Sequence, residues 1–282
     1  MSSESGAMEL RKVPGPSALG GGWRRFFDLL WLIAVNKFKV TYVGAALGYV
    51  WTLIRPLMLF AVLLFVFTQI FKISGGVTHY PVLLLFGVML FSFFQEATTK
   101  AVTSFVAEEG IVRKMQFPRL AIPMAWVLTS LFTLVINLGV VFVFILAYGV
   151  GPYWTWLLLP ALLLPLLVLT TAVSALLSAL YVRYRDVNII WSVAVQALFY
   201  ATPVLYVLDQ LDQQYRWIIL LNPLTPIFLA AREWIIDPAA PGPVDSAGGV
   251  AHLVGSLIVF VAVCVVSIWV FAREAPRMAE EL

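Results

Sequence analysis

The stretch MLFAVLLFVF, from Met58 to Phe67, is ten consecutive apolar residues without a charge or a turn residue. A strand of a membrane β-barrel would alternate polar and apolar residues, so this continuous run predicts a helix instead. A bilayer core about 30 Å thick needs roughly 20 predominantly apolar helical residues for one crossing. Several stretches of that length recur along the chain, and we therefore expect several membrane-spanning helices.

Composition supports the same conclusion. Of the 282 residues, 62% are hydrophobic and only 12% are charged, about half the charged fraction of a soluble domain. A soluble fold cannot bury that much apolar surface. The single cysteine, Cys264, excludes an intramolecular disulfide. We predict an all-α polytopic membrane protein.

Six spans are predicted, at about residues 43–71, 80–106, 120–148, 155–180, 189–207 and 250–272. Residues 1–22, which are polar and rich in Gly and Pro, are expected to form a disordered tail without a cleavable signal peptide. Residues 274–282 form a second tail. Residues 23–40 have cations at both ends around an interrupted apolar centre, which predicts an amphipathic helix lying in the membrane interface. The transmembrane domain as a whole would cover residues 41–273.

Residues 212–237 form a broken segment between the fifth and sixth spans. It contains WIILLNPLTPIFLAAREWIID, Trp217 to Asp237, split by the pairs Asn222-Pro223 and Thr225-Pro226. Proline removes a backbone donor and disfavours helix at the preceding residue, so one continuous span is not expected. Two re-entrant half-helices fit better, and such backbone is tolerated only under protein or beside a water-filled cavity.

Basic residues give the orientation. With a cytoplasmic N-terminus, thirteen lysines and arginines face the cytoplasm and three face outward, namely Lys72, Arg216 and Arg232. The positive-inside rule therefore predicts both termini in the cytoplasm. The stretch YVRYRDVNII, residues 181–190, is then a cytoplasmic turn in which Asp186 opens the fifth helix and Arg183 and Arg185 anchor at the interface.

Catalytic chemistry finds little support in the sequence. The histidines, His79 and His252, lie far apart without ligands at metal-binding spacing, and no G-x-x-x-x-G-K-[ST] loop is present. We therefore predict no catalytic residue, no metal site and no nucleic-acid partner.

Charges inside the spans are few. Glu96 and Lys100, at i and i+4, are either an interfacial ion pair or part of a polar conduit. Arg55 stands beside Pro56 about a dozen residues into the first span. It contacts either an anionic phosphate or the carbonyls that the proline frees.

Four segments, taken together and in order, resemble the membrane subunit of bacterial polysaccharide ABC exporters, the family of O-antigen, teichoic-acid and capsule permeases. They are LGYVWTLIRPL (47–57), RKMQFPRLAIP (113–123), RYRDVNIIWSVAVQALFYATPVLY (183–206) and LNPLTPI (221–227). The resemblance covers about residues 25–272. Arg55 departs from the pattern, since many relatives have an uncharged residue there.

The resemblance implies a homodimer with a channel at its interface, joined by two copies of a cytoplasmic ATPase that binds ATP and Mg²⁺. Its cargo would be a polyprenyl-diphosphate-linked glycan of O-antigen, teichoic-acid or galactan type, moved across the bacterial inner membrane. Segment 107–119 would be the coupling helix on the ATPase, with a smaller contact from the turn near residue 185. The implied coupling residues are Glu108, Glu109, Arg113, Lys114, Phe117, Arg119, Arg183, Arg185 and Asp186.

The same resemblance places the entrance for the lipid head group at the interfacial helix and first span. Basic residues there suit a diphosphate, and aromatic side chains can stack on sugar rings. The substrate-binding residues implied by the resemblance are Arg24, Arg25, Lys37 and Lys39; side-chain chemistry alone adds the aromatic Tyr42, Tyr49 and Trp51 and the charged Arg55.

Two alternatives remain. A secondary transporter commonly has repeated halves and an ion site at the midplane, but only Glu96 is a candidate and no internal repeat is detectable. A multispan lipid-processing enzyme needs a polar catalytic cluster, and none is evident. The exporter subunit is the preferred interpretation.

Overall fold

A computed structural model describes residues 22–42, 48, 50–72, 79–110, 118–208 and 211–275, and all regular secondary structure in them is helical. Five helical segments are long and apolar enough to cross a membrane. They are α2 (Val50–Phe65) continued by the π-helical turn η1 (Val66–Ile70), α3 (Tyr80–Val102), α6 (Ala121–Ala147), α7 (Leu159–Arg183) preceded by η2 (Trp154–Leu158), and α12 (Val250–Glu274). The predicted all-α membrane fold is confirmed. The predicted tails lie almost entirely outside the described residues.

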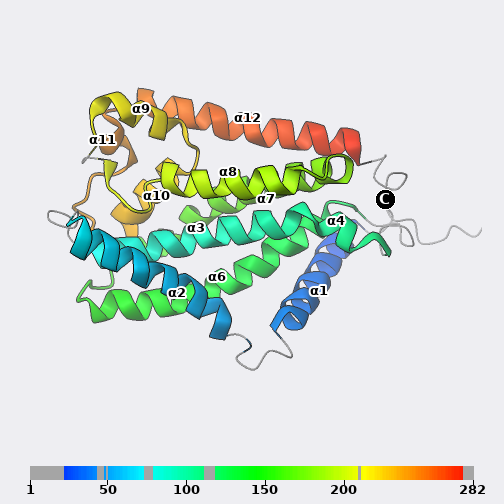
Figure 1. Ribbon diagram of the computed structural model, residues 1–282, viewed down its shortest axis with the longest axis horizontal. Coiled ribbons are helices and arrows are strands. Elements are labelled where there is room, and N and C mark those ends of the chain that lie inside the picture. Colours follow the sequence, from blue (N-terminus) through cyan, green and yellow to red (C-terminus); the bar gives the residue numbers. More distant parts are fainter. Residues whose placement is uncertain are drawn as a thin grey trace, which may run out of the picture.

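Helix α3 is the centre of the bundle. It packs against α2, α6, α7 and α8 (Figure 1). Of the residues in its most apolar stretch, 78% are buried inside the protein, compared with 17% in the corresponding stretch of α2. Phe86, Phe91 and Phe94 are among the largest fully buried side chains. Helix α3 is apolar on all of its faces because neighbouring helices cover each of them.

The fifth crossing differs from its prediction of residues 189–207, because α8 (Val187–Ala201) ends six residues early. Its chain runs antiparallel to α3: the Trp191 indole donates to the Thr98 hydroxyl over 3.2 Å, and farther on the Tyr80 hydroxyl donates to the Leu205 carbonyl over 2.8 Å. Pro203 prevents continuation of the helix. Residues 202–208, most of which are buried, leave the α-helical path and run along α3 toward Tyr80. Among the described residues, five helical segments are long enough to cross a membrane, or six if the bent pair between α8 and α12 is counted as one crossing.

The break predicted between the fifth and sixth spans is confirmed. Helix α9 (Gln213–Leu221) is followed by α10 (Thr225–Ala231) and the π-helical turn η4 (Arg232–Ile236), with a bend of 97° between the two arms. At the bend, the Asn222 amide donates to the Thr202 hydroxyl over 2.8 Å, and the Leu224 amide donates to the Asn222 side-chain oxygen over 3.0 Å. Asn222 thus joins the bent pair to the end of α8. Helix α11 (Pro243–Ala247) leads into α12.

One end of the bundle carries Lys37, Lys39, Lys100, Arg119, Arg183, Arg185 and Arg273, and is called the basic end below. The opposite end has three cations among the described residues, Lys72, Arg216 and Arg232. Helix α1 (Gly22–Tyr42) lies at the basic end, inclined to the long helices (Figure 1). Helix α3 stops at Val102, where the predicted second span continued to 106, and the short α4 (Ser104–Ala107) follows. The charge asymmetry used to predict orientation is thus an asymmetry between the two ends of the fold.

Candidate functional site

A cluster of charged residues surrounds Trp126 at the basic end. Lys37 of α1 forms an ion pair with Glu108, the residue that follows α4. The Lys37 ammonium also lies 4.3 Å from the centre of the Trp126 ring on α6. The Lys37 and Glu108 side chains are only 10% and 25% exposed, so this contact is not an open surface pair.

A second lysine approaches the same indole. The Lys100 ammonium lies 5.5 Å from the centre of the Trp126 ring and 2.5 Å from Glu96 on its own helix, α3. The predicted i, i+4 pair is therefore confirmed. Cations near an aromatic face are stabilised by its quadrupole. The five residues, called the Trp126 cluster below, connect α1, α3 and α6 with the segment after α4.

Helix α1 is also attached to α6 one turn before Lys37. The Thr129 hydroxyl lies 2.7 Å from the Ala125 carbonyl oxygen of its own helix and 3.2 Å from that of Ala34 on α1. Ala34 and Ala125 are fully buried. Small side chains at both positions let the two helices approach closely enough for this contact. The backbone of α1 is thus held against α6 at Ala34.

A polar stripe follows the exposed surface of α8. Asn188, Ser192, Gln196 and Tyr200 recur every fourth residue and share one side of the helix, and the last three are exposed. Within the described part of the chain, the Gln196 amide makes no hydrogen bond, whereas the Ser192 hydroxyl donates to the Ile189 carbonyl over 2.7 Å. An unpartnered amide facing hydrocarbon is costly, so this side of α8 requires water or another polar surface.

Residues 28–236, most of the chain and most of the bundle just described, match the ABC-2 type transporter family. The chain belongs to this family.

Curated relatives agree. The O-antigen export system permease protein RfbA of Klebsiella pneumoniae is 30% identical over 212 residues, covering 75% of this chain and 81% of that protein. The O-antigen export system permease protein RfbA of Myxococcus xanthus is 26% identical over 264 residues, covering 92% of this chain and 96% of that protein. As an ABC-2 transporter membrane protein, the chain is a multi-pass inner-membrane transport subunit rather than an enzyme, and an ABC transporter includes an ATPase partner.

The residues predicted to couple this ABC-2 subunit to its ATPase lie at the basic end where they are described. Glu108 and Glu109 are partly buried beside α4. Arg119 precedes α6, and its Nη1 is buried without a hydrogen-bond partner. Arg113, Lys114 and Phe117 lie outside the described residues.

The turn between α7 and α8 is exposed. Arg183 and Arg185 lie over the rings of Tyr184 and Tyr181, at 5.4 and 5.1 Å from the ring centres. Asp186 occupies the N-cap position of α8, as predicted, although its carboxylate makes no capping hydrogen bond. The turn therefore presents two stacked guanidinium groups and one carboxylate at the basic end.

The predicted substrate-binding residues are less closely grouped. Trp51 and Arg55 are exposed on α2. Arg55 lies five residues into the described helix α2, and Thr52, one turn before it, accepts a hydrogen bond from Asn137 in the middle of α6. Lys39 is exposed, but Lys37 is occupied by Glu108 and Trp126, a neighbourhood that does not leave it open to a diphosphate. The side chains of Arg24, Arg25 and Tyr42, and all of Tyr49, lie outside the described residues.

Sequence reasoning missed Trp126 and the polar stripe. Lys37 and Glu108 are 71 positions apart, and no spacing rule connects them to each other or to a tryptophan on a third helix. The stripe on α8 was readable from its i, i+4 spacing, but only the structure shows that this side is exposed.

Proposed function

We propose that the chain is the channel-forming subunit of an ATP-driven exporter that moves a polyprenyl-diphosphate-linked polysaccharide, of O-antigen, teichoic-acid or galactan type, from the cytoplasm to the outer face of the inner membrane. It acts as a homodimer with two copies of an ATPase, which bind ATP and Mg²⁺. The basic end faces the cytoplasm, with both termini on that side. The relatives named as O-antigen export permeases support the class of cargo.

The observation that carries the proposal is the polar stripe on α8. Gln196 lies near the middle of the crossing and is exposed on a surface of the single chain. Hydroxyl and amide groups suit a glycan, whose own hydroxyls exchange hydrogen bonds with them, and no charge is needed. A wet pathway bordered by this side of α8 therefore supports glycan transport better than ion transport.

A second copy of the chain supplies the rest of the pathway. Across the exposed surface of α8 from the stripe, with the exposed Val193 between them, Ala194, Ala197 and Ala201 form a row of small exposed residues. Small residues let membrane helices approach closely, and a two-fold axis brings the same surface of the partner into contact. The dimer would then pack along the alanines and leave the polar stripe toward the lumen.

Movement reaches this pathway from segment 107–119, which docks on the ATPase. Glu108 lies within that segment and is paired with Lys37, so a shift of the segment is transmitted to α1. Helix α1 leads into α2, where Trp51 and Arg55 are exposed for the glycan and the diphosphate. The Thr52 carbonyl, one turn before Arg55, accepts a hydrogen bond from the Asn137 amide over 3.5 Å, which places this part of α2 beside the middle of α6. An arginine there is costly unless it meets an anion, and a guanidinium matches phosphate geometry.

Thiol accessibility tests the pathway. In a Cys264→Ser chain assembled with its ATPase, we expect Gln196→Cys to react with a water-soluble, membrane-impermeant maleimide during ATP turnover. Val261→Cys, on the exposed apolar surface of α12, is the matched control and should stay unreactive. Ala197→Cys should form a disulfide between two copies. Equal reactivity at positions 196 and 261 would refute the pathway.

Cargo is tested in cells. Depleting the chain should accumulate polyprenyl-linked glycan on the cytoplasmic leaflet, measured by its inaccessibility to a periplasmic glycosidase until the membrane is permeabilised. An unchanged glycan distribution would contradict the proposed cargo while leaving the thiol result interpretable.

A further inference from the structure

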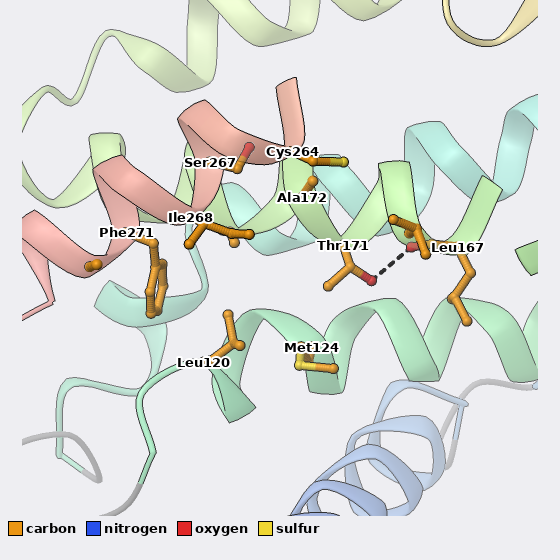
Figure 2. A pocket seen from close by; sticks show the side chains of 12 residues that line it. Leu120, Met124, Leu167, Thr171, Ala172, Cys264, Ser267, Ile268 and Phe271 are labelled. Atoms are coloured by element: carbon orange, nitrogen blue, oxygen red, sulfur yellow. Dashed lines mark hydrogen bonds between the residues drawn. The ribbon is translucent and has the colours of Figure 1, made fainter. Parts of the chain in front are cut away.

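A groove of about 510 Å³ lies between α6, α7 and α12 (Figure 2). Small residues create it: Ala172 and Ala175 on α7 face Cys264 and Ser267 on α12. Its volume falls within the roughly 300–1,000 Å³ of typical small-molecule sites. Cys264 and Phe271 both line it, so it extends at least about 10 Å along α12.

The walls of the groove are apolar. The two hydroxyls that line it are already satisfied within their own helices: Thr171 donates to the Leu167 carbonyl over 2.8 Å, and Ser267 donates to the Val263 carbonyl over 2.6 Å. Figure 2 shows the first of these bonds, with Leu120 and Phe271 at the same end of the groove and Leu167 at the other. A groove that offers no hydrogen bond accepts a hydrocarbon chain rather than water or a sugar.

One arginine adjoins a mouth of the groove. Arg119 immediately precedes the lining residue Leu120, whereas Arg273 turns to the opposite side of α12, where its guanidinium lies 5.5 Å from the centre of the Trp269 ring. Arg183 ends α7 at the same basic end. Nη1 of Arg119 is buried with no hydrogen-bond partner, and neither Arg119 nor Arg273 forms an ion pair with any described carboxylate. A buried guanidinium nitrogen requires an anionic or carbonyl acceptor.

We propose that this groove is a binding site for an anionic phospholipid of the leaflet at the basic end, with one acyl chain between α7 and α12 and the phosphate at Arg119. Basic pockets between membrane helices bind lipid phosphates in this way, and guanidinium groups match phosphate geometry. Bulk phospholipid is the occupant rather than the exported lipid because the groove borders α12, whose Val265, Ile268 and Trp269 are exposed toward lipid.

The site also adjoins the coupling segment. The ring of Phe271 lies 6.2 Å from that of Phe105 on α4, and Phe105 packs with Ile122, Ala179 and Val182. Glu108 follows three residues later. A lipid chain that fixes Phe271 therefore stabilises the position of α4, which makes ATPase coupling dependent on anionic lipid.

The only cysteine of the chain lines the groove and reports its occupancy. Delipidated full-length protein in detergent is alkylated with N-ethylmaleimide and followed by intact mass. Phosphatidylglycerol should slow alkylation of Cys264 at least threefold at concentrations at which phosphatidylcholine with the same acyl chains has little effect. Arg119→Gln should remove the difference, whereas Arg273→Gln, whose side chain lies over Trp269, and Lys72→Gln, at the opposite end, should keep it. Ser267→Leu should fill the groove and slow alkylation without added lipid.

Equal protection by the two phospholipids would overturn the proposal. So would protection by polyprenyl diphosphate at lower concentrations than phosphatidylglycerol, because that result would assign the groove to the cargo. Native mass spectrometry of the unmodified protein gives a readout that does not depend on the variants folding. Retention of phosphatidylglycerol at collision energies that remove phosphatidylcholine is expected, and equal retention would refute the site.

Discussion

Breaking the contact between Lys37 and Glu108 should disconnect the ATPase from the pathway. Lys37→Met keeps most of the length and apolar stem of the side chain but removes the ammonium. It therefore eliminates both the ion pair with Glu108 and the contact with the Trp126 ring. Glu108→Gln removes the charge while keeping an oxygen that can accept a hydrogen bond from Lys37.

The size of the effect follows from burial. Exposed ion pairs contribute about 0.2–1 kcal/mol, whereas removing one partner of a fully buried pair costs about 3–5 kcal/mol. With side chains 10% and 25% exposed, the pair lies between these limits, and we expect a coupling energy of about 1–2 kcal/mol. The cation–π contact adds about 0.5–2 kcal/mol. Lys37→Met should therefore cost about 2–3 kcal/mol, more than Glu108→Gln.

A double-mutant cycle measures this energy. Unfolding in mixed micelles gives the stability of each variant, and ATP hydrolysis by the complex in proteoliposomes gives its coupling. The double variant should be less destabilised than the sum of the single variants, by about 1–2 kcal/mol. Transport-coupled hydrolysis should fall roughly tenfold, which corresponds to about 1.4 kcal/mol. The control is Asn36→Met, an exposed neighbour on α1. Strictly additive effects, or full coupling in Lys37→Met, would refute the reasoning.

Three further substitutions test the Trp126 cluster, the bend at Asn222 and the packing of residue 204 on α3, each measured as a change in the free energy of unfolding. Trp126→Leu should cost about 1–2 kcal/mol because two ammonium groups lose an aromatic face, and Trp126→Phe should cost less; equal effects would exclude a cation–π role. Asn222→Ala should cost about 1–3 kcal/mol because it removes the 2.8 Å bond to Thr202 and the 3.0 Å bond from Leu224; an unchanged midpoint would show that the bend forms without it. Gly87→Leu should cost about 1–3 kcal/mol by overpacking, since a Cβ there already lies 3.3 Å from Val204 Cγ1 and 3.5 Å from its carbonyl oxygen; Gly87→Ala should be milder, and a neutral Gly87→Leu would place the segment after α8 elsewhere.

Hydropathy alone placed the long helices, because a span must be apolar over its whole length. It failed where tertiary contacts decide the backbone. Residues 202–207 are as apolar as the helix before them, and they leave the helical path at Pro203 to pack beside Gly87. Hydropathy likewise does not predict the end of α3 at Val102, because the residues that follow in α4 include the apolar Phe105 and Val106.

The candidate site was predictable only where its residues are neighbours on one helix. Glu96 and Lys100 were paired from their spacing, and Asp186 was assigned to the start of α8 from its position in the sequence. The contacts of Lys37 are Glu108 and Trp126, which come from two other regions of the chain. Because sequence spacing does not reveal these contacts, the charge of Lys37 alone suggested a lipid phosphate as its partner. A cation near a membrane interface can pair with a lipid phosphate or with protein groups, and the packing of the surrounding helices determines which of the two it contacts.

The arrangement of contacts on α1 indicates how movement at the basic end would be converted. Ala34 is held against α6 through Thr129, and Lys37, one turn later, is held by Glu108. We expect a displacement of Glu108 to tilt α1 about Ala34 rather than to translate it. We expect α2, where 17% of the residues in the apolar stretch are buried, to follow this tilt, and α3, where 78% are buried, to resist it. Because a densely packed helix resists displacement, we expect α2 to move during turnover while α3, α6 and α7 form the fixed frame, so that the pathway opens on the side where Trp51 and Arg55 are exposed.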